Sequence, residues 1–99
     1  MKYIEKYKEL GFDVSESLKD NISEKPIREK DRILQFLKNG TYNGVRCSSI
    51  YDYIKNEPTF KNINLYTDGV YEWDDEEIYH FEKYNMKLED EFIKYVLST

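Results

Sequence analysis

The segment Asp68–Glu91, "DGVYEWDDEEIYHFEKYNMKLEDE", decides how this chain folds, because it combines a turn, a helix start and a cluster of charge. Ten of its side chains are carboxylates and two are lysines. The same segment contributes large apolar side chains, namely Val70, Trp73, Ile78, Phe81, Met86 and Leu88. It is therefore expected to supply both part of the core and most of the negative charge.

A turn at Asp68-Gly69 predicts a β-hairpin over residues 62–73, because this dipeptide tolerates the positive φ values of a type I′ turn. Asp74 then predicts a helix start: it can cap the helix, and Glu77 at the third helical position completes a capping box, which contributes about 1 kcal/mol. Asp75 and Glu76 add negative charge at the positive end of the helix dipole. A last helix is expected over residues 89–97, with the apolar side Phe92, Ile93, Val96 and Leu97.

Upstream of this segment, helices are expected first. The stripe Tyr3, Ile4, Tyr7 and Leu10 predicts a helix over residues 1–10, which Gly11 ends. A short helical turn capped by Ser15 is expected to bury Leu18 and Ile22. A clearer helix covers residues 26–38, with Pro26 in its first turn, a buried face of Ile27, Ile33, Leu34 and Leu37, and a stop at Asn39-Gly40. Residues 41–62 indicate a short strand plus loop.

The predicted fold class is therefore α+β: a single domain over residues 1–99 with N-terminal helices, a small antiparallel sheet and two C-terminal helices. The N-terminus is not expected to be a signal peptide, and no segment approaches the ~20 apolar residues that span a bilayer. The single cysteine, Cys47, excludes an internal disulfide and favours a reducing compartment. We expect a cytoplasmic protein that does not associate with membranes.

Charge is unevenly distributed along the chain. The net charge is −5, but residues 68–91 alone carry −8 whereas residues 1–67 carry +2. Such a protein would repel the phosphates of nucleic acids and attract a basic protein surface. The expected partner is a protein with a basic surface, which would contact residues after the turn: Tyr66, Asp68, Tyr71, Glu72, Asp74, Asp75, Glu76, Glu77 and Tyr79.

The same acids do not indicate a metal site or cofactor, because four consecutive side chains point around a helix axis and the spacing of a calcium loop is missing. Catalytic signatures are likewise missing, and we expect a binding protein without catalytic residues. One enzymatic alternative remains open at this stage: Cys47 and His80 form a catalytic pair if the fold brings them together. A further alternative also stays open: the acidic residues form a solvated face that only keeps the protein soluble.

Several motifs resemble those of small bacterial immunity-type proteins encoded beside polymorphic or contact-dependent toxins. The matching elements are Leu37–Gly40, "TDGVYEW" at Thr67–Trp73, the stretch Tyr79–Tyr84 and Leu88–Phe92. Glu89 stands where such proteins often have proline. The resemblance implies that the chain neutralises a cognate toxin domain, frequently a nuclease, by binding it in the producing cell. A phage-borne DNA mimic that inhibits a nuclease or restriction system is the alternative, and it predicts acids spaced like phosphates along one face.

Overall fold

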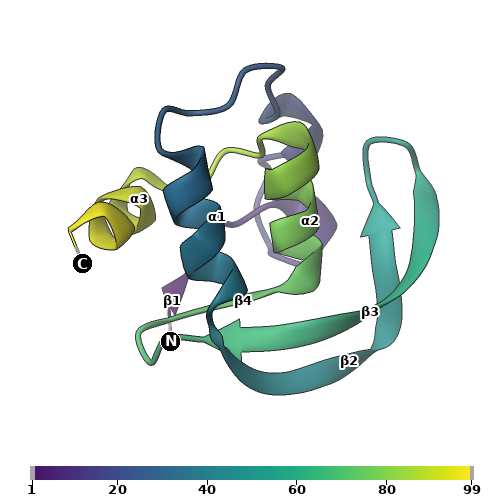
Figure 1. Cartoon of the computed structure of the whole chain (residues 1–99). Coiled ribbons are helices and arrows are strands. Elements are labelled where there is room, and N and C mark those ends of the chain that lie inside the picture. The colour runs from purple at the N-terminus through teal and green to yellow at the C-terminus, as the bar shows by residue number, and fades with distance from the viewer. Residues whose placement is uncertain (1, 99) are drawn as a thin grey trace.

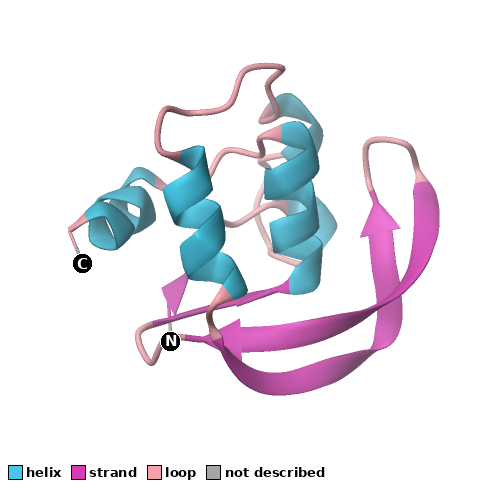
Figure 2. Cartoon of the chain, in the orientation of Figure 1, coloured by secondary structure: helices cyan, strands magenta, loops and turns pink. Residues whose placement is uncertain are grey.

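The computed structural model describes residues 2–98 and contains three α-helices beside a four-stranded sheet. Figure 1 shows their arrangement, and Figure 2 shows the helices lying on one side of the strands. The strands are β1 (Lys2–Tyr3), β2 (Thr41–Asp52), β3 (Glu57–Thr67) and β4 (Tyr71–Asp74). The helices are α1 (Lys30–Lys38), α2 (Asp75–Tyr84) and α3 (Asp90–Leu97), preceded by two 3₁₀ turns, η1 (Lys8–Leu10) and η2 (Leu18–Asp20). The predicted α+β class is confirmed.

The sheet has the strand order β1-β4-β3-β2. Strands β2, β3 and β4 are antiparallel to their neighbours, but β1 pairs with β4 in parallel through Lys2–Tyr71 and Tyr3–Glu72. The sheet is therefore mixed and not antiparallel throughout as predicted. None of the helices in residues 2–98 has the length and apolar character needed to cross a bilayer.

A single core joins the helices to the inner face of the sheet. Phe81, Phe92 and Trp73 lie at its centre, each at most 3% exposed. The indole Nε1 of Trp73 donates a hydrogen bond to the Leu37 carbonyl at 2.9 Å, which ties the end of α1 to β4. Ile33 and Leu37 are buried as predicted, whereas Ile27 is 44% exposed because α1 starts only at Lys30.

The capping box predicted at the start of α2 is confirmed. The Asp74 side chain accepts from the Glu77 N–H, and the Glu77 side chain accepts from the Asp74 N–H, both at 3.0 Å. The loop between β3 and β4 lies where the sequence predicts it, but the type I′ turn is wrong, because only Gly69 has a positive φ. Asp68 instead stabilises the loop by accepting hydrogen bonds from the Val70 and Tyr71 N–H groups.

The helix predicted over residues 1–10 is wrong. Lys2–Tyr3 form β1, and only Lys8–Leu10 make a 3₁₀ turn, which Gly11 ends in the left-handed conformation. The open edge of β4 offers backbone partners that a helix could not use, and the Ile4 carbonyl accepts from the Glu89 N–H. The cap of η2 is Ser17 and not Ser15, although Leu18 is buried as expected.

The largest departure from prediction is the hairpin formed by β2 and β3, residues 41–67, which we call the arm. It has strands of 12 and 11 residues where a short strand and loop are predicted. Three register shifts interrupt the pairing of its two strands. Asn43 and the pair Cys47–Ser48 are extra residues on β2, and the three residues Thr59–Lys61 of β3 lie opposite the single residue Ile50 of β2. Because each bulge bends a strand, the arm curves past α2 and its tip returns beside that helix (Figure 1).

Candidate functional site: the arm and the groove beside α2

The acidic run Asp74–Glu77 does not form the exposed surface that the sequence predicts. Asp74, Glu76 and Glu77 are 4%, 4% and 6% exposed, and Asp75 is half-buried. Their side chains leave the start of α2 in different directions, as expected for consecutive positions on a helix. Each one holds a different segment of the fold. The run is therefore not part of an exposed acidic field, and it does not make the row of charges that DNA mimicry requires.

Three of these carboxylates attach the arm to α2. Asp74 Oδ2 lies 2.7 Å from Arg46 Nη2 of β2. Asp75 Oδ2 accepts from the backbone N–H of Asn64 at 2.9 Å and from its side-chain amide at 3.0 Å. Glu76 Oε2 accepts from the Tyr51 N–H at 3.0 Å. The negative charge of Asp74, Asp75 and Glu76 thus has a structural role.

The fourth carboxylate, Glu77, faces Glu5 of the N-terminal segment. Glu5 is 1% exposed, and burial raises its pKa to about 7, while burial and the neighbouring Glu5 carboxyl raise the pKa of Glu77 as well. Among residues 2–98, neither Glu5 oxygen has a hydrogen-bond partner other than the Glu77 carboxyl that it faces. The two carboxyls are therefore almost completely shielded from solvent.

Three further residues predicted at the interface flank the loop between β3 and β4. Tyr71 is buried in the core, where its ring packs against Phe92 at 4.9 Å between centroids. Asp68 is exposed, but its second carboxylate oxygen accepts from the Tyr95 hydroxyl. Glu72 is half-buried on β4. This end of the sheet therefore does not present the aromatic and acidic surface expected from the sequence.

The tip of the arm is attached to α2 by a buried carboxylate. Asp52 Oδ2 accepts from the hydroxyls of Tyr79 and Tyr84, both at 2.6 Å, and Oδ1 accepts from the Ile54 and Lys55 N–H groups. Although burial opposes ionisation, these donors hold the pKa of Asp52 at about 2. Burial and the Asp52 carboxylate raise the pKa of Tyr79 to about 12. Tyr79, predicted at the interface, thus also has a structural role.

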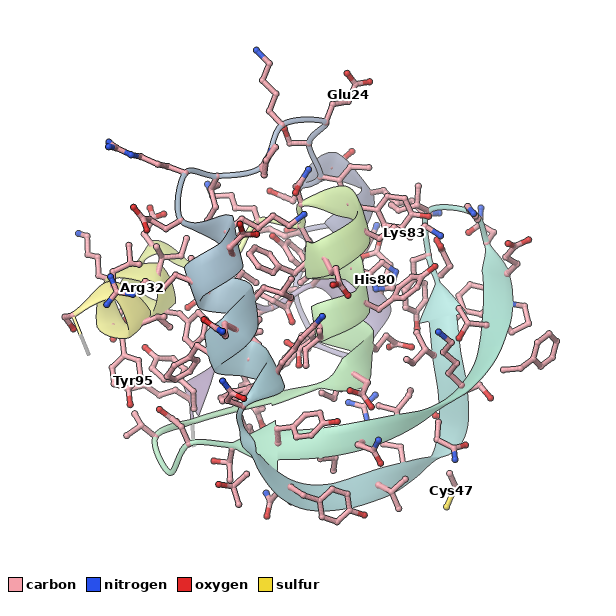
Figure 3. All side chains as sticks on the ribbon, viewed as in Figure 1. Glu24, Arg32, Cys47, His80, Lys83 and Tyr95 are labelled. Atoms are coloured by element: carbon pink, nitrogen blue, oxygen red, sulfur yellow. The ribbon has the colours of Figure 1, made fainter. Side chains whose placement is uncertain are left out.

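His80 belongs to the same attachment. It is fully buried, its Nε2 accepts from the Tyr53 N–H at 3.1 Å, and its Nδ1 lies 2.7 Å from the Glu76 carbonyl. The ring is therefore the neutral Nδ1–H tautomer, and burial lowers its pKa. Cys47 is exposed on β2, and Figure 3 shows it well apart from His80. The catalytic pair considered from the sequence is not assembled.

A groove lies between the arm and α2, and three residues predicted at the interface meet there: Tyr66 from β3 with Asp75 and Tyr79 from α2. It encloses about 340 Å³. Ile50 and Ile78 are its apolar walls, and the remaining lining residues are Lys38, Lys61, Asn62 and Glu82. Its charge is balanced in part by an ion pair between Lys38 and Glu82 at 2.8 Å. The groove thus combines two tyrosines and two isoleucines with four charged side chains.

The arm also carries the most exposed large hydrophobic side chains of residues 2–98, which the sequence reasoning missed. Phe60 is 84% exposed, Tyr42 61% and Val45 53%. Tyr42 pairs with Tyr66, and Val45 pairs with Asn64, two residues away on β3, so Tyr42 and Val45 share a face of the sheet with the groove residue Tyr66. In the sequence, these residues are recognisable only as isolated apolar positions in a polar stretch. The alternation of apolar and polar residues that would predict a strand is missing, because the bulges interrupt it.

Phe60 is unusual in its backbone as well as its exposure. Its φ is +63°, the left-handed region that costs a bulky residue about 1–3 kcal/mol, and it lies in the bulge opposite Ile50. Burial does not compensate for this cost, since the ring faces solvent. A strained backbone that presents an exposed aromatic ring is a feature typical of binding sites.

Residues 2–98 contain no group of three or more His, Cys, Asp and Glu side chains placed to hold a metal ion. Comparisons of the chain with protein-family models, curated proteins and solved structures find no match. The assignment of a function therefore depends on the geometry of the arm and its groove.

Proposed function

We propose that this protein binds and neutralises a toxin domain in the cytoplasm of the cell that produces it, and that the arm makes the contact. The observation that carries the proposal is Phe60, which combines a left-handed backbone with an 84% exposed ring. Aromatic anchors of this kind dominate the free energy of protein–protein binding when a partner pocket buries them.

Other exposed side chains of the arm support an extended interface. Tyr42 and Val45 add exposed apolar area on the face of the arm that continues into the groove. β2 is the last strand of the sheet, so its outer edge, apart from the Tyr51 N–H that donates to Glu76, offers backbone groups to a partner strand. Tyrosine is enriched at interfaces because it offers a large contact area with little loss of rotamer entropy.

The identity of the partner as a toxin follows from the resemblance to immunity-type proteins, and the structure connects two motifs that carry it. Gly40 ends the first motif and Trp73 ends the second, and a Cβ at Gly40 would lie 2.5 Å from the Trp73 ring. Together these residues form the base from which the arm starts. The resemblance thus concerns the scaffold, whereas the exposed arm is the part free to match one particular toxin.

This proposal differs from the acidic-surface hypothesis in its expected response to salt. The carboxylates of the run Asp74–Glu77 are engaged within the fold, and the groove has a paired Lys38 and Glu82. Binding through Phe60, Tyr42 and Val45 is therefore expected to be driven by burial of apolar area, with an affinity that changes less than threefold between roughly 50 and 500 mM salt.

The test uses the purified protein and the toxin-like domain encoded beside it, with affinity measured by calorimetry. Phe60→Ser is expected to raise Kd at least tenfold, whereas the control Ile27→Ser, which removes an exposed apolar side chain outside the arm, changes it less than about twofold. In cells, the wild-type protein and the control should protect against the toxin domain and Phe60→Ser should not. If the wild-type protein does not bind, the toxin is rejected as the partner. If the two variants bind with equal affinity, the arm is rejected as the contact surface.

A further inference from the structure

The paired carboxyls of Glu5 and Glu77 have no part in the proposed interface, and they join two segments far apart in the sequence. Glu5 follows β1, and Glu77 lies in the first turn of α2. Glu5 is 1% and Glu77 6% exposed. A buried carboxylate without a donor is costly, and a carboxyl that faces a carboxylate removes that cost only when a proton lies between them.

We propose that the Glu5–Glu77 pair is a proton-dependent latch for residues 2–10, closed while the two carboxyls share a proton and opened when both ionise. The segment has other polar attachments as well: Lys2 N–H donates to the Val70 carbonyl, and the Ile4 carbonyl accepts from the Glu89 N–H. Lys2 also forms an exposed ion pair with Glu91, Lys8 N–H donates to the Glu16 carbonyl, and the Glu9 carboxylate accepts from the Ser17 hydroxyl and the Leu18 N–H. The hydroxyl of Tyr7 donates to the Lys87 carbonyl at 2.5 Å.

The acids around the pair favour retention of the proton. Asp74 at the end of β4 and Glu89 before α3 both act on Glu5 with negative charge, and Asp74 also acts on Glu77. Tyr7, on the same segment as Glu5, is neutral because burial raises its pKa. The cations of this region are Arg46, which is paired with Asp74, and Lys6 and Lys87, which line a cavity together with Glu5.

Opening the latch would uncover apolar surface. Tyr3 and Leu10 of this segment line a hollow of about 280 Å³ together with Phe12, Leu65 and Trp73, and its charged lining residues are Arg46, Glu72, Asp74 and Glu77. Release of residues 2–10 therefore removes part of this lining and frees the edge of β4 that pairs with β1. The device works near neutral pH, because the pKa of Glu5 is about 7 when the segment is closed and returns to the usual glutamate range when it opens.

The expected effect follows from the linkage between proton binding and opening. If Glu5 titrates at about 7 when closed and at about 4.5 when open, the opening constant rises roughly tenfold between pH 6 and 8.5. Hydrogen exchange, corrected for intrinsic rates, reports this locally through the Lys2 and Glu89 amides. Their protection should fall about tenfold over this range, whereas that of the α1 amides should not change.

Two variants and one control make the test decisive. Glu5→Gln replaces one carboxyl by a neutral amide, and Glu77→Gln keeps the capping box, which accepts glutamine at this position. Both should abolish the pH dependence, whereas Glu24→Gln, on the exposed loop labelled in Figure 3, should retain it. Three results would reject the latch. The Lys2 and Glu89 amides of the wild-type protein could keep their protection between pH 6 and 8.5, or these amides could lose as much protection in Glu5→Gln as in the wild type. In the third case, the α1 amides would lose protection together with them.

A direct measurement does not depend on the folding of any variant. Carbon-13 NMR of the wild-type protein follows each side-chain carboxyl through its titration. The latch requires that at least one of Glu5 and Glu77 has its midpoint above pH 6. Midpoints of both groups near the usual value for an exposed glutamate would overturn the proposal.

Discussion

Arg46 Nη2 lies 2.7 Å from Asp74 Oδ2, so the middle of the arm is attached to the residue that caps α2. Asp74 therefore has two roles, one through its charge and one through its hydrogen bond to the Glu77 N–H. The two roles can be separated, since asparagine is an equally good helix cap but carries no charge to form an ion pair with a guanidinium.

Asp74→Ala should lower the free energy of unfolding by about 2 kcal/mol, because the cap is lost and Arg46 is left unpaired. Asp74→Asn should cost less than about 1 kcal/mol, because the cap remains and repulsion of the buried Glu5 and Glu77 is relieved. Urea unfolding measures both values. Equal costs for the two substitutions would show that the cap contributes nothing measurable.

Asp52 should govern stability in acid. Its pKa in the folded protein is about 2, below the ordinary value of 3.8, so its contribution is fully present above pH 4 and is lost as the pH falls toward 2. Asp52→Asn should cost about 1–3 kcal/mol at pH 6, and the difference from wild type should shrink at pH 2. Chemical unfolding at the two pH values provides the comparison, and a difference that is constant with pH contradicts this role.

Phe60→Gly should leave stability unchanged or raise it by up to about 1 kcal/mol, because glycine adopts a φ of +63° without strain and the exposed ring contributes little burial. The same substitution should weaken binding to the toxin domain. Thermal unfolding measures the first effect and calorimetry the second. A clear loss of stability would mean that the ring supports the fold and would remove the strain argument for a binding role.

Gly40→Ala should destabilise the protein by about 1–3 kcal/mol, because the new Cβ would lie 2.5 Å from Trp73 Cζ2 and 3.0 Å from Tyr66 Cβ. Trp73→Phe removes the atom at the closest approach, so the cost of the alanine should be smaller in that background. A double-mutant cycle in urea measures this coupling. Strictly additive costs would place the origin of the effect elsewhere.

The parts of the fold that the sequence predicts well are those encoded locally. The capping box joins Asp74 and Glu77 three residues apart, and the end of α1 follows from Asn39-Gly40. The N-terminal helix failed because its stripe of apolar residues fits two conformations, and the open edge of β4 selects the strand. The sequence of residues 1–10 does not indicate that this edge is available for pairing.

The candidate site was predicted only in part, for a similar reason. Glu76 and Glu77 lie in an acidic run, and acidic runs are generally exposed. Their burial depends on Tyr51 and Glu5, which are far away in sequence. Tyr66, Asp75 and Tyr79 were identified because they flank the turn and the helix start, but Phe60 was not, since its exposure results from a bulge that interrupts any periodic pattern.

The arm is held to α2 from Arg46, Asn64 and Asp52, whereas Tyr42, Val45 and Phe60 point to solvent. Mutations at the solvent positions can therefore accumulate without a loss of folding free energy. Under the proposed function, natural selection can exchange one recognition specificity for another along this hairpin, while the same few anchoring side chains preserve the architecture beneath it.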